Sequence, residues 1–197
     1  MKDKYKTIKE PAQGYFLDRG SKFYSFAYPV ESEEQVKKIL KQLHKKYRDA
    51  RHIVYAYILD DKNARASDAG EPSGSSGPPI LRTLKSMNLT KILVAVVRYF
   101  GGKKLGIPGL INAYSTATRK AIENAKIIEF VITKDYYLKC KYNQVSIVMN
   151  ILEKLGGKII NQEYDKACNM TVSIPVSVLK SFEQYMRQLR IELRKLT

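Results

Sequence analysis

The chain has 197 residues, of which 44% are hydrophobic, so it can form one domain of ordinary size or two small ones, and disorder is not the default. Its 35 Lys and Arg residues outnumber 19 Asp and Glu residues and give a formal net charge of +16. A positive surface favours polyanionic partners such as RNA, the ribosome, DNA or an anionic membrane; the alternative is a generally cationic protein that binds none of them specifically.

The sequence also indicates where the protein works. No segment has the apolar length of a signal peptide or a membrane span. The two cysteines, Cys140 and Cys168, are too few and too far apart for a disulfide framework, and no Cys/His spacing indicates zinc. We therefore expect a protein of the reducing cytosol with no membrane partner, no metal and no cofactor.

The first predicted elements are a strand and a helix. Residues 20–30, GSKFYSFAYPV, alternate aromatic or apolar side chains with small polar ones, which is typical of a strand. Ser32 then suits a helix N-cap, because two acidic residues follow in the first turn and apolar residues recur at helical spacing over residues 36–43. The other face of this helix is rich in lysine and is either simply solvated or an anion contact.

A second strand, residues 52–59, is followed by a loop of unusual composition. Its core, SDAGEPSGSSGPP at residues 67–79, brings together two acids, four serines, three glycines and three prolines. The last two prolines suit the first turn of a helix over residues 80–87, and Ser75 or Ser76 could accept backbone N–H bonds just before it.

The two acids of this loop, Asp68 and Glu71, allow three interpretations. They could hold the loop by accepting N–H bonds, bind Mg²⁺, or act as acid and base. No nucleophile motif accompanies them, which favours the first interpretation. His44 and His52 are the other possible bases, although single histidines are more often structural.

The second glycine-rich stretch, RYFGGKKLGIPGL at residues 98–110, leads from a nearly continuous apolar strand, residues 91–100, into a helix over residues 110–125. Backbone N–H groups in such a turn, next to a helix N-terminus, form a concavity suited to anions. Gly101 and Gly106 have the spacing of the two Walker glycines, but the Lys and Ser/Thr of that motif are missing, so this is not a nucleotide P-loop. The alternative is that the glycines only turn the chain tightly.

The rest of the chain repeats the alternation of strands and helices on a smaller scale. We predict a strand, a helix, two strands and a final helix at residues 135–142, 145–156, 158–165, 169–176 and 177–189. The β-α-β-β-α order predicts a ferredoxin-like unit with helices on one face of an antiparallel sheet. Its expected core residues are Tyr137, Leu138, Val148, Ile151, Leu152, Ile159 and Val172. The boundary between the two domains is expected near residues 126–136.

Two long motifs in this order, SDAGEPSGSSGPPIL and VVRYFGGKKLGIPGLINAY, resemble the paired signature of the IMPACT family and its YigZ-like bacterial members. RGSKFYSFAYPV and YRDARHIVYAY resemble earlier segments of the family, so the resemblance covers about residues 16–125, and the tail resembles the small C-terminal domain of bacterial members. The chain departs from the family pattern at Ala69, where a second Asp is common, and at Ser75, Ser76 and Pro108, where Thr, Ala and Gly are common.

The resemblance implies an α+β fold with two domains. Residues 1–130 are expected to form a βα domain similar to the second domain of a small-subunit ribosomal protein. Residues 131–197 are expected to form a ferredoxin-like βαββα domain similar to the last domain of the translocation elongation factor. Both of these proteins work on ribosomal RNA. Eukaryotic relatives are implicated in restraining a kinase that phosphorylates a translation initiation factor, through an additional N-terminal domain that is not part of this sequence.

We therefore expect a cytosolic RNA- or ribosome-binding protein linked to the regulation of translation, rather than an enzyme. The alternative is an enzyme or sensor that acts on a small phosphorylated ligand held between the two glycine-rich loops. In either case residues 68–79 and 98–110 should lie side by side, with a cation of the second stretch beside an acid of the first. The candidate residues of this anion or RNA surface are Asp68, Glu71, Ser73, Ser75, Ser76, Arg98, Gly101, Gly102, Lys103, Lys104 and Gly106.

Overall fold

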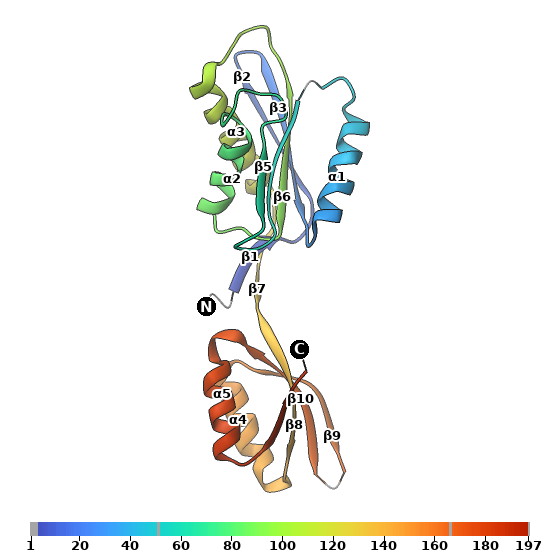
Figure 1. Ribbon diagram of the computed structural model, residues 1–197, viewed down its shortest axis with the longest axis vertical. Helices are drawn as coiled ribbons and strands as arrows, with labels where there is room; N and C mark the ends of the chain where they lie inside the picture. Colours follow the sequence, from blue (N-terminus) through green and yellow to red (C-terminus); the bar gives the residue numbers. More distant parts are fainter. Residues whose placement is uncertain (1–3, 51, 166, 197) are drawn as a thin grey trace. The chain divides into compact units, whose positions relative to one another are not determined.

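The computed structural model describes residues 4–50, 52–165 and 167–196, and the chain divides into two compact units (Figure 1). One unit is Lys6–Glu129, and the other comprises the chain from Phe130 onward together with Lys4 and Tyr5. Strands β1 (Lys4–Ile8) and β7 (Ile127–Val131) form a two-stranded sheet, and the chain passes between the units within these strands.

The unit of residues 6–129 contains a five-stranded sheet in the order β2-β3-β6-β4-β5, in which all neighbours are antiparallel. The strands are β2 (Ala12–Asp18), β3 (Ser21–Pro29), β4 (His52–Ile58), β5 (Ala64–Ser67) and β6 (Ile92–Tyr99). The predicted strands correspond to β3, β4 and β6. Strand β6 lies in the centre, and burial on both faces explains its nearly continuous apolar sequence.

Helices cover both faces of this sheet. Helix α1 (Glu33–Lys46) packs on one face, and helices α2 (Gly77–Ser86) and α3 (Gly106–Glu123) pack on the other (Figure 1). Side chains of β6 alternate between the two cores: Val94 and Val96 contact α2 and α3, whereas Ala95 and Val97 belong to the cluster under α1. The predicted N-cap of α1 is confirmed, because the Ser32 hydroxyl accepts from the backbone N of Gln35 at 3.4 Å.

The second unit has the predicted ferredoxin-like fold (Figure 1). Its antiparallel sheet has the order β11-β8-β10-β9, and its helices pack against one apolar cluster of the sheet. The elements are β8 (Thr133–Cys140), α4 (Val145–Leu155), β9 (Lys158–Tyr164), β10 (Cys168–Pro175), α5 (Leu179–Gln188) and β11 (Glu192–Lys195). The edge strand β11 was not predicted. Within the described residues, no helix is both long and apolar enough to cross a membrane.

The predicted core of this unit is correct at five positions and wrong at two. Leu138, Val148, Leu152 and Val172 are buried, and Ile151 packs against them. Tyr137 instead lies on the opposite face from Leu138, where its hydroxyl donates to Asn169 at 2.8 Å and the Arg194 guanidinium lies over its ring. Ile159 is 40% exposed because β9 is an edge strand whose register shifts opposite β10.

The two cysteines, although distant in sequence, are register partners on β8 and β10. Both are free thiols in the core. Burial, together with the neighbouring Cys168, raises the pKa of the Cys140 thiol to about 11. The thiol of Cys140 is therefore protonated and unreactive at neutral pH.

Candidate functional site

The first glycine-rich loop is organised around the carboxylate of Asp68. Its Oδ1 accepts from the backbone N of Ser76 and Gly77 at 3.0 and 2.9 Å and from the Ser76 hydroxyl at 2.7 Å. Its Oδ2 accepts from the backbone N of Gly74 at 2.8 Å. Partial burial raises the pKa of this carboxyl, but the four donors lower it more, so the pKa lies below its usual value. Asp68 thus satisfies the free N–H groups at the start of α2.

This arrangement corrects the prediction that a serine caps α2. Ser75 and Ser76 are both fully buried, and the Ser76 side chain makes no capping bond to the helix. Their hydroxyls donate instead, Ser75 to the carbonyl of Pro72 at 2.6 Å and Ser76 to Asp68. The charged carboxylate is the stronger acceptor and takes the N–H groups that a serine would otherwise receive.

Glu71 joins the first glycine-rich loop to the second. The Nη1 of Arg98 lies 2.7 and 2.9 Å from the two carboxylate oxygens of Glu71, and the Tyr114 hydroxyl on α3 donates to Oε1 at 2.7 Å. The side chains of Arg98 and Glu71 are only 9% and 4% exposed. Burial and the charge of Glu71 raise the pKa of Tyr114 far above its usual value. The pair confirms that the two stretches meet, with a cation of the second beside an acid of the first.

Both acids of the loop therefore have partners inside the protein. Neither carboxylate is free to act as a base, and the described residues contain no group of three His, Cys, Asp or Glu side chains that could hold a metal ion. His52 also supports the loop, since its Nδ1 lies 2.7 Å from the carbonyl oxygen of Ala69. Of the predicted surface, Asp68, Glu71, Ser75, Ser76 and Arg98 make hydrogen bonds inside the protein, and the buried Nε of Arg98 is left without a hydrogen-bond partner. Ser73, Gly101, Gly102, Lys103, Lys104 and Gly106 are exposed.

The second glycine-rich stretch packs against the turn between β2 and β3. The backbone N of Gly101 donates to the Ser21 hydroxyl at 3.2 Å. A Cβ on Gly101 would lie 1.9 Å from the carbonyl carbon of Gly20, so only glycine allows this approach of the two backbones. This contact places residues 19–22 (RGSK) beside residues 99–102 (YFGG). It thereby holds Phe100 beside the turn between β2 and β3.

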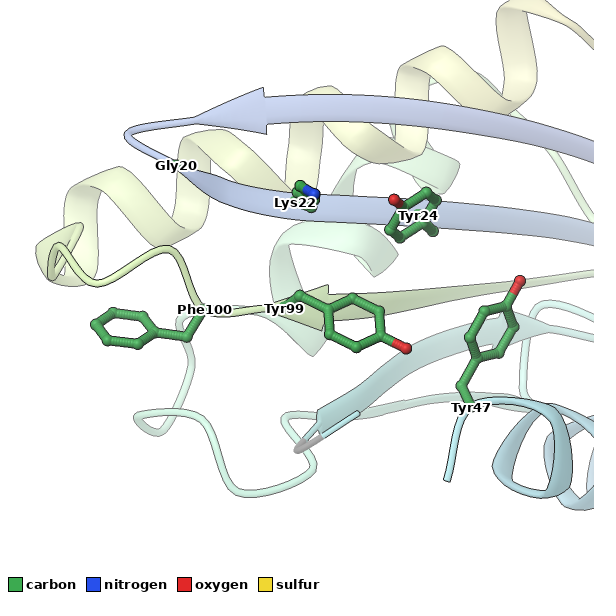
Figure 2. Close-up of a pocket in the computed structure, with 6 residues that line it drawn as sticks. All are labelled: Gly20, Lys22, Tyr24, Tyr47, Tyr99 and Phe100. Atoms are coloured by element: carbon green, nitrogen blue, oxygen red, sulfur yellow. The ribbon is translucent and has the colours of Figure 1, made fainter. Parts of the chain in front are cut away.

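A pocket of about 530 Å³ opens beside this contact, on the face of the sheet that carries α1 (Figure 2). Tyrosines from three elements border it, as Figure 2 shows: Tyr24 comes from β3, Tyr99 from β6 and Tyr47 from the end of α1. We call it the tyrosine pocket, and its lining residues are Gly20, Lys22, Tyr24, Tyr47, Tyr99 and Phe100.

The pocket exists because α1 ends before the sheet does. Beyond Tyr47 the strand ends carry aromatic side chains that no helix covers, and Tyr15 and Phe100 are 47% and 56% exposed. The ring centroids of Tyr15 and Tyr24 lie 5.1 Å apart, and those of Tyr24 and Tyr99 lie 6.0 Å apart. A continuous row of aromatic rings therefore crosses β2, β3 and β6.

Positive side chains border these rings. Lys22 lies in the pocket lining, directly opposite Tyr99 in the β3–β6 register. The Nζ of Lys46 lies 5.3 Å from the centroid of the Tyr47 ring. Asp49 supplies a negative charge at the rim, where its carboxylate accepts from the Tyr99 hydroxyl at 3.0 Å. Exposed rings beside lysines can stack on planar groups and pair with phosphates.

The buried Arg98 cluster lies behind the tyrosine pocket, on the other face of the same strands. Arg98 is opposite Phe23, and their neighbours Tyr99 and Lys22 are opposite each other. Because successive side chains of a strand point to opposite faces, the first pair faces α2 and α3, and the second pair faces the pocket. The Glu71–Arg98 pair therefore supports, from behind, the strand ends that form the pocket.

The sequence analysis did not identify the tyrosine pocket. The alternation in GSKFYSFAYPV indicated a strand, and aromatic residues in a strand usually indicate packing. The available signal was the density of Tyr and Phe around Lys22, together with YF at the end of the strand over residues 91–100.

Comparisons with known proteins identify the family. Residues 19–122 match the Impact N-terminal domain, and residues 138–189 match a domain of unknown function (DUF1949). The IMPACT family member YigZ of Escherichia coli is 30% identical over 166 residues, which cover 82% of this chain and 81% of YigZ. YvyE of Bacillus subtilis is 26% identical, over 96% of this chain and 88% of YvyE.

One solved structure gives the same result for the fold. The crystal structure of a hypothetical protein matches with a TM-score of 0.68 and 25% identity, over 100% of this chain and 99% of that one. A structure of the two-domain translational regulator Yih1 is 30% identical over 64% of this chain and 48% of Yih1, with a TM-score of 0.36. The Impact N-terminal domain matches more than half of this chain, and the similarity to YigZ extends over about four fifths of both chains. This chain therefore belongs to the IMPACT family.

Proposed function

We propose that this protein binds RNA, either free or in the ribosome, and acts in the regulation of translation in the cytosol. The observation that carries the proposal is the tyrosine pocket, where exposed and half-buried aromatic rings lie beside lysines. Proteins bind nucleic acid through this combination, because the rings stack on bases and the cations neutralise phosphates.

The charge of the protein supports an anionic partner. The net charge is +16, and two acids of the glycine-rich loop, Asp68 and Glu71, are engaged inside the protein. Lys103 and Lys104 are exposed in the turn that follows Phe100, and none of the ion pairs found among the described residues includes them. These two lysines are the best candidates for phosphate contacts outside the pocket.

The translational part of the proposal comes from the family resemblance, which is an argument by analogy. The other function considered, chemistry on a small phosphorylated ligand between the glycine-rich loops, would need a free acid or base there. The bonds of Asp68 and Glu71 within the protein speak against that role. RNA binding would use the exposed residues and does not require Asp68 or Glu71 to be free.

The test is the salt dependence of binding to purified ribosomes and to an RNA pool of mixed sequence. We expect affinity to fall steeply between low and physiological salt, because each neutralised phosphate releases counterions. Replacing both Lys103 and Lys104 by Ala should lower affinity for all sequences and reduce the slope of log K against log salt by about 1.4, which is about 0.7 for each lost contact with a single strand.

The matched control replaces Lys37 and Lys41, on the exposed face of α1, with the same loss of charge. Its slope should change less, and the melting temperature of both variants should stay near that of the parent because exposed lysines contribute little to stability. A parent protein that binds neither ribosomes nor RNA at low salt would contradict the proposal. Equal slopes for the parent and the Lys103/Lys104 variant would remove this turn from the contact surface.

A further inference from the structure

We infer that the tyrosine pocket binds unpaired bases of single-stranded RNA, an inference that rests on the proposed function and narrows its ligand. The bases stack on the exposed rings of the pocket, and the adjoining phosphates pair with lysines at its edge. Double-stranded RNA would then be bound less tightly by the same surface.

The rings offer separate faces for stacking. Tyr15, Tyr24 and Tyr99 come from three neighbouring strands, with centroids 5.1 and 6.0 Å apart, but the first two planes are tilted by 48° and the last two meet edge to face at 86°. Tyr24 and Tyr99 are half-buried, whereas Tyr15 is 47% exposed. Phe100, directly after β6, is 56% exposed, and the Arg98 guanidinium lies 5.7 Å from the centroid of its ring. Aromatic rings on neighbouring strands of an open sheet face are a known platform on which single strands lay successive bases.

The pocket is large enough for a base and its sugar. Its volume of about 530 Å³ falls in the range of about 300–1,000 Å³ that is usual for sites of small molecules and cofactors. Four of its six lining residues are aromatic, so a planar group finds apolar surface on several sides.

The charges around the pocket select an anionic chain. Lys22 lies in its lining and Lys46 lies over the ring of Tyr47, so the pocket has cations close by for the phosphates next to a stacked base. Asp49, bound to the Tyr99 hydroxyl, makes one rim unfavourable for phosphate and thereby gives the strand a preferred path. A proline-rich peptide also suits aromatic grooves, but it carries no phosphate for the two lysines.

Single strands are favoured over duplexes because of where the rings lie. In an A-form duplex the bases are stacked on each other, and the faces of their rings are not available to a protein. The rings of Tyr15, Tyr24 and Tyr99 lie on a sheet face and do not project as a helix that could enter a groove. A duplex can use only the lysines of this surface, so its binding loses the stacking contribution.

The test measures fluorescence anisotropy of a labelled 12-nucleotide single strand without self-pairing, and of the blunt duplex of the same sequence. Phe100→Ala and Tyr24→Ala should each weaken single-strand binding by about 5-fold to 150-fold, which corresponds to the ~1–3 kcal/mol of one base stack. Duplex binding should change by less than about 2-fold. The salt slope should stay at the parent value, because no phosphate contact is lost.

Three further variants separate stacking from folding. Tyr99→Phe keeps the ring and should retain single-strand affinity within about 2-fold, whereas Tyr99→Ala should lose it. Tyr164→Ala removes an exposed tyrosine of the other unit and should leave binding unchanged. Melting temperatures show whether each variant folds, and Phe100 is the safest position because its ring is more than half exposed.

The outcomes distinguish this inference from the proposed function. If the parent protein binds neither the single strand nor the duplex, that result contradicts both this inference and the proposed function. A parent that binds RNA while folded Phe100→Ala and Tyr24→Ala variants bind the single strand equally well overturns the stacking site and leaves RNA binding intact. Equal affinity of the parent for single strand and duplex also overturns it. A proline-rich peptide that binds the pocket without competition from the single strand would assign the pocket to a protein partner instead.

Discussion

One nitrogen of Arg98 lies 2.7 and 2.9 Å from the two carboxylate oxygens of Glu71, and this buried pair joins the two glycine-rich stretches. Arg98 is the last residue but one of the central strand β6, and Glu71 lies in the loop before α2. Tyr114 on α3 donates to the same carboxylate, so three elements meet at one acid. The pair therefore holds in place the strand end that bears the tyrosine pocket on its other face.

Removing one partner of this pair should destabilise the protein strongly. Arg98→Ala leaves the Glu71 carboxylate buried without its cation, and we expect the free energy of unfolding to fall by about 3–5 kcal/mol. Chemical denaturation followed by circular dichroism measures this. The control is Arg65→Ala, whose ion pair with Glu33 is largely exposed on the arginine side and should contribute less than about 1 kcal/mol. Similar losses for the two variants would show that the buried pair is not structural.

Asp68 should make stability depend on acid pH. Its folded pKa lies below the unfolded value of about 3.9, so its contribution is fully present above that value and is lost as pH falls through the folded pKa. The difference in unfolding free energy between the parent and Asp68→Asn should thus be largest near pH 6 and shrink below about pH 4. Urea titrations at several pH values test this. A difference that is constant with pH would mean that the charge of Asp68 is not what stabilises the loop.

Ala69 occupies a strained backbone position. Its φ is +47°, a left-handed conformation that costs a residue with a Cβ about 1–2 kcal/mol. Ala69→Gly relieves this strain and loses part of the gain to the flexibility of glycine in the unfolded chain, so we expect a net stabilisation of about 0.5–1 kcal/mol.

The matched control for Ala69 is Ala66→Gly on β5, a strand residue that is not among those with positive φ. It should lower the free energy of unfolding by about 0.5–1 kcal/mol or more, since glycine adds flexibility there and removes a methyl group that packs against the core. Thermal melts of both variants and the parent in the same buffer measure the two shifts in melting temperature. The strain argument fails if the two substitutions shift the melting temperature in the same direction.

We also expect two domains that separate near residues 126–136. The side chains of Ile127, Phe130, Val131 and Ile132 are exposed, and a protease can reach this segment more easily than the cores on either side. Limited trypsin digestion should cut first after Lys126 or Lys134 and leave two resistant fragments, identified by mass spectrometry. First cuts within α3 or beyond Lys134, or uniform resistance of the whole chain, would favour a single cooperative domain.

Much of the fold could be predicted because its central elements have strong local patterns. The apolar sequence of β6 and the Ser32 cap of α1 are examples. The strands that escaped prediction lie at or near sheet edges, where little side-chain burial is required. Strand β2 contains Gly14 and buries few of its side chains, and β11 consists of ELRK, three of whose four residues are charged.

The site was harder to predict because it depends on contacts between distant segments. The sequence indicated that the two glycine-rich stretches meet, and the Glu71–Arg98 pair confirms it. It did not show that Arg98 is buried, because an arginine at the end of an apolar strand is usually exposed. Nor could alternation along β3 reveal that Tyr24 is only partly buried and borders a pocket, since that depends on where α1 ends on the sheet.

The most direct test of the central claim is ultraviolet crosslinking of the protein to RNA in living cells, followed by mapping of the crosslinked residues. We predict RNA attached to the protein after irradiation, with crosslinks in residues 15–24 and 98–104, which contain the exposed rings and the lysines of the turn. Recovery of no more RNA than from unirradiated cells, or crosslinks confined to the unit that begins at Phe130, would contradict the account.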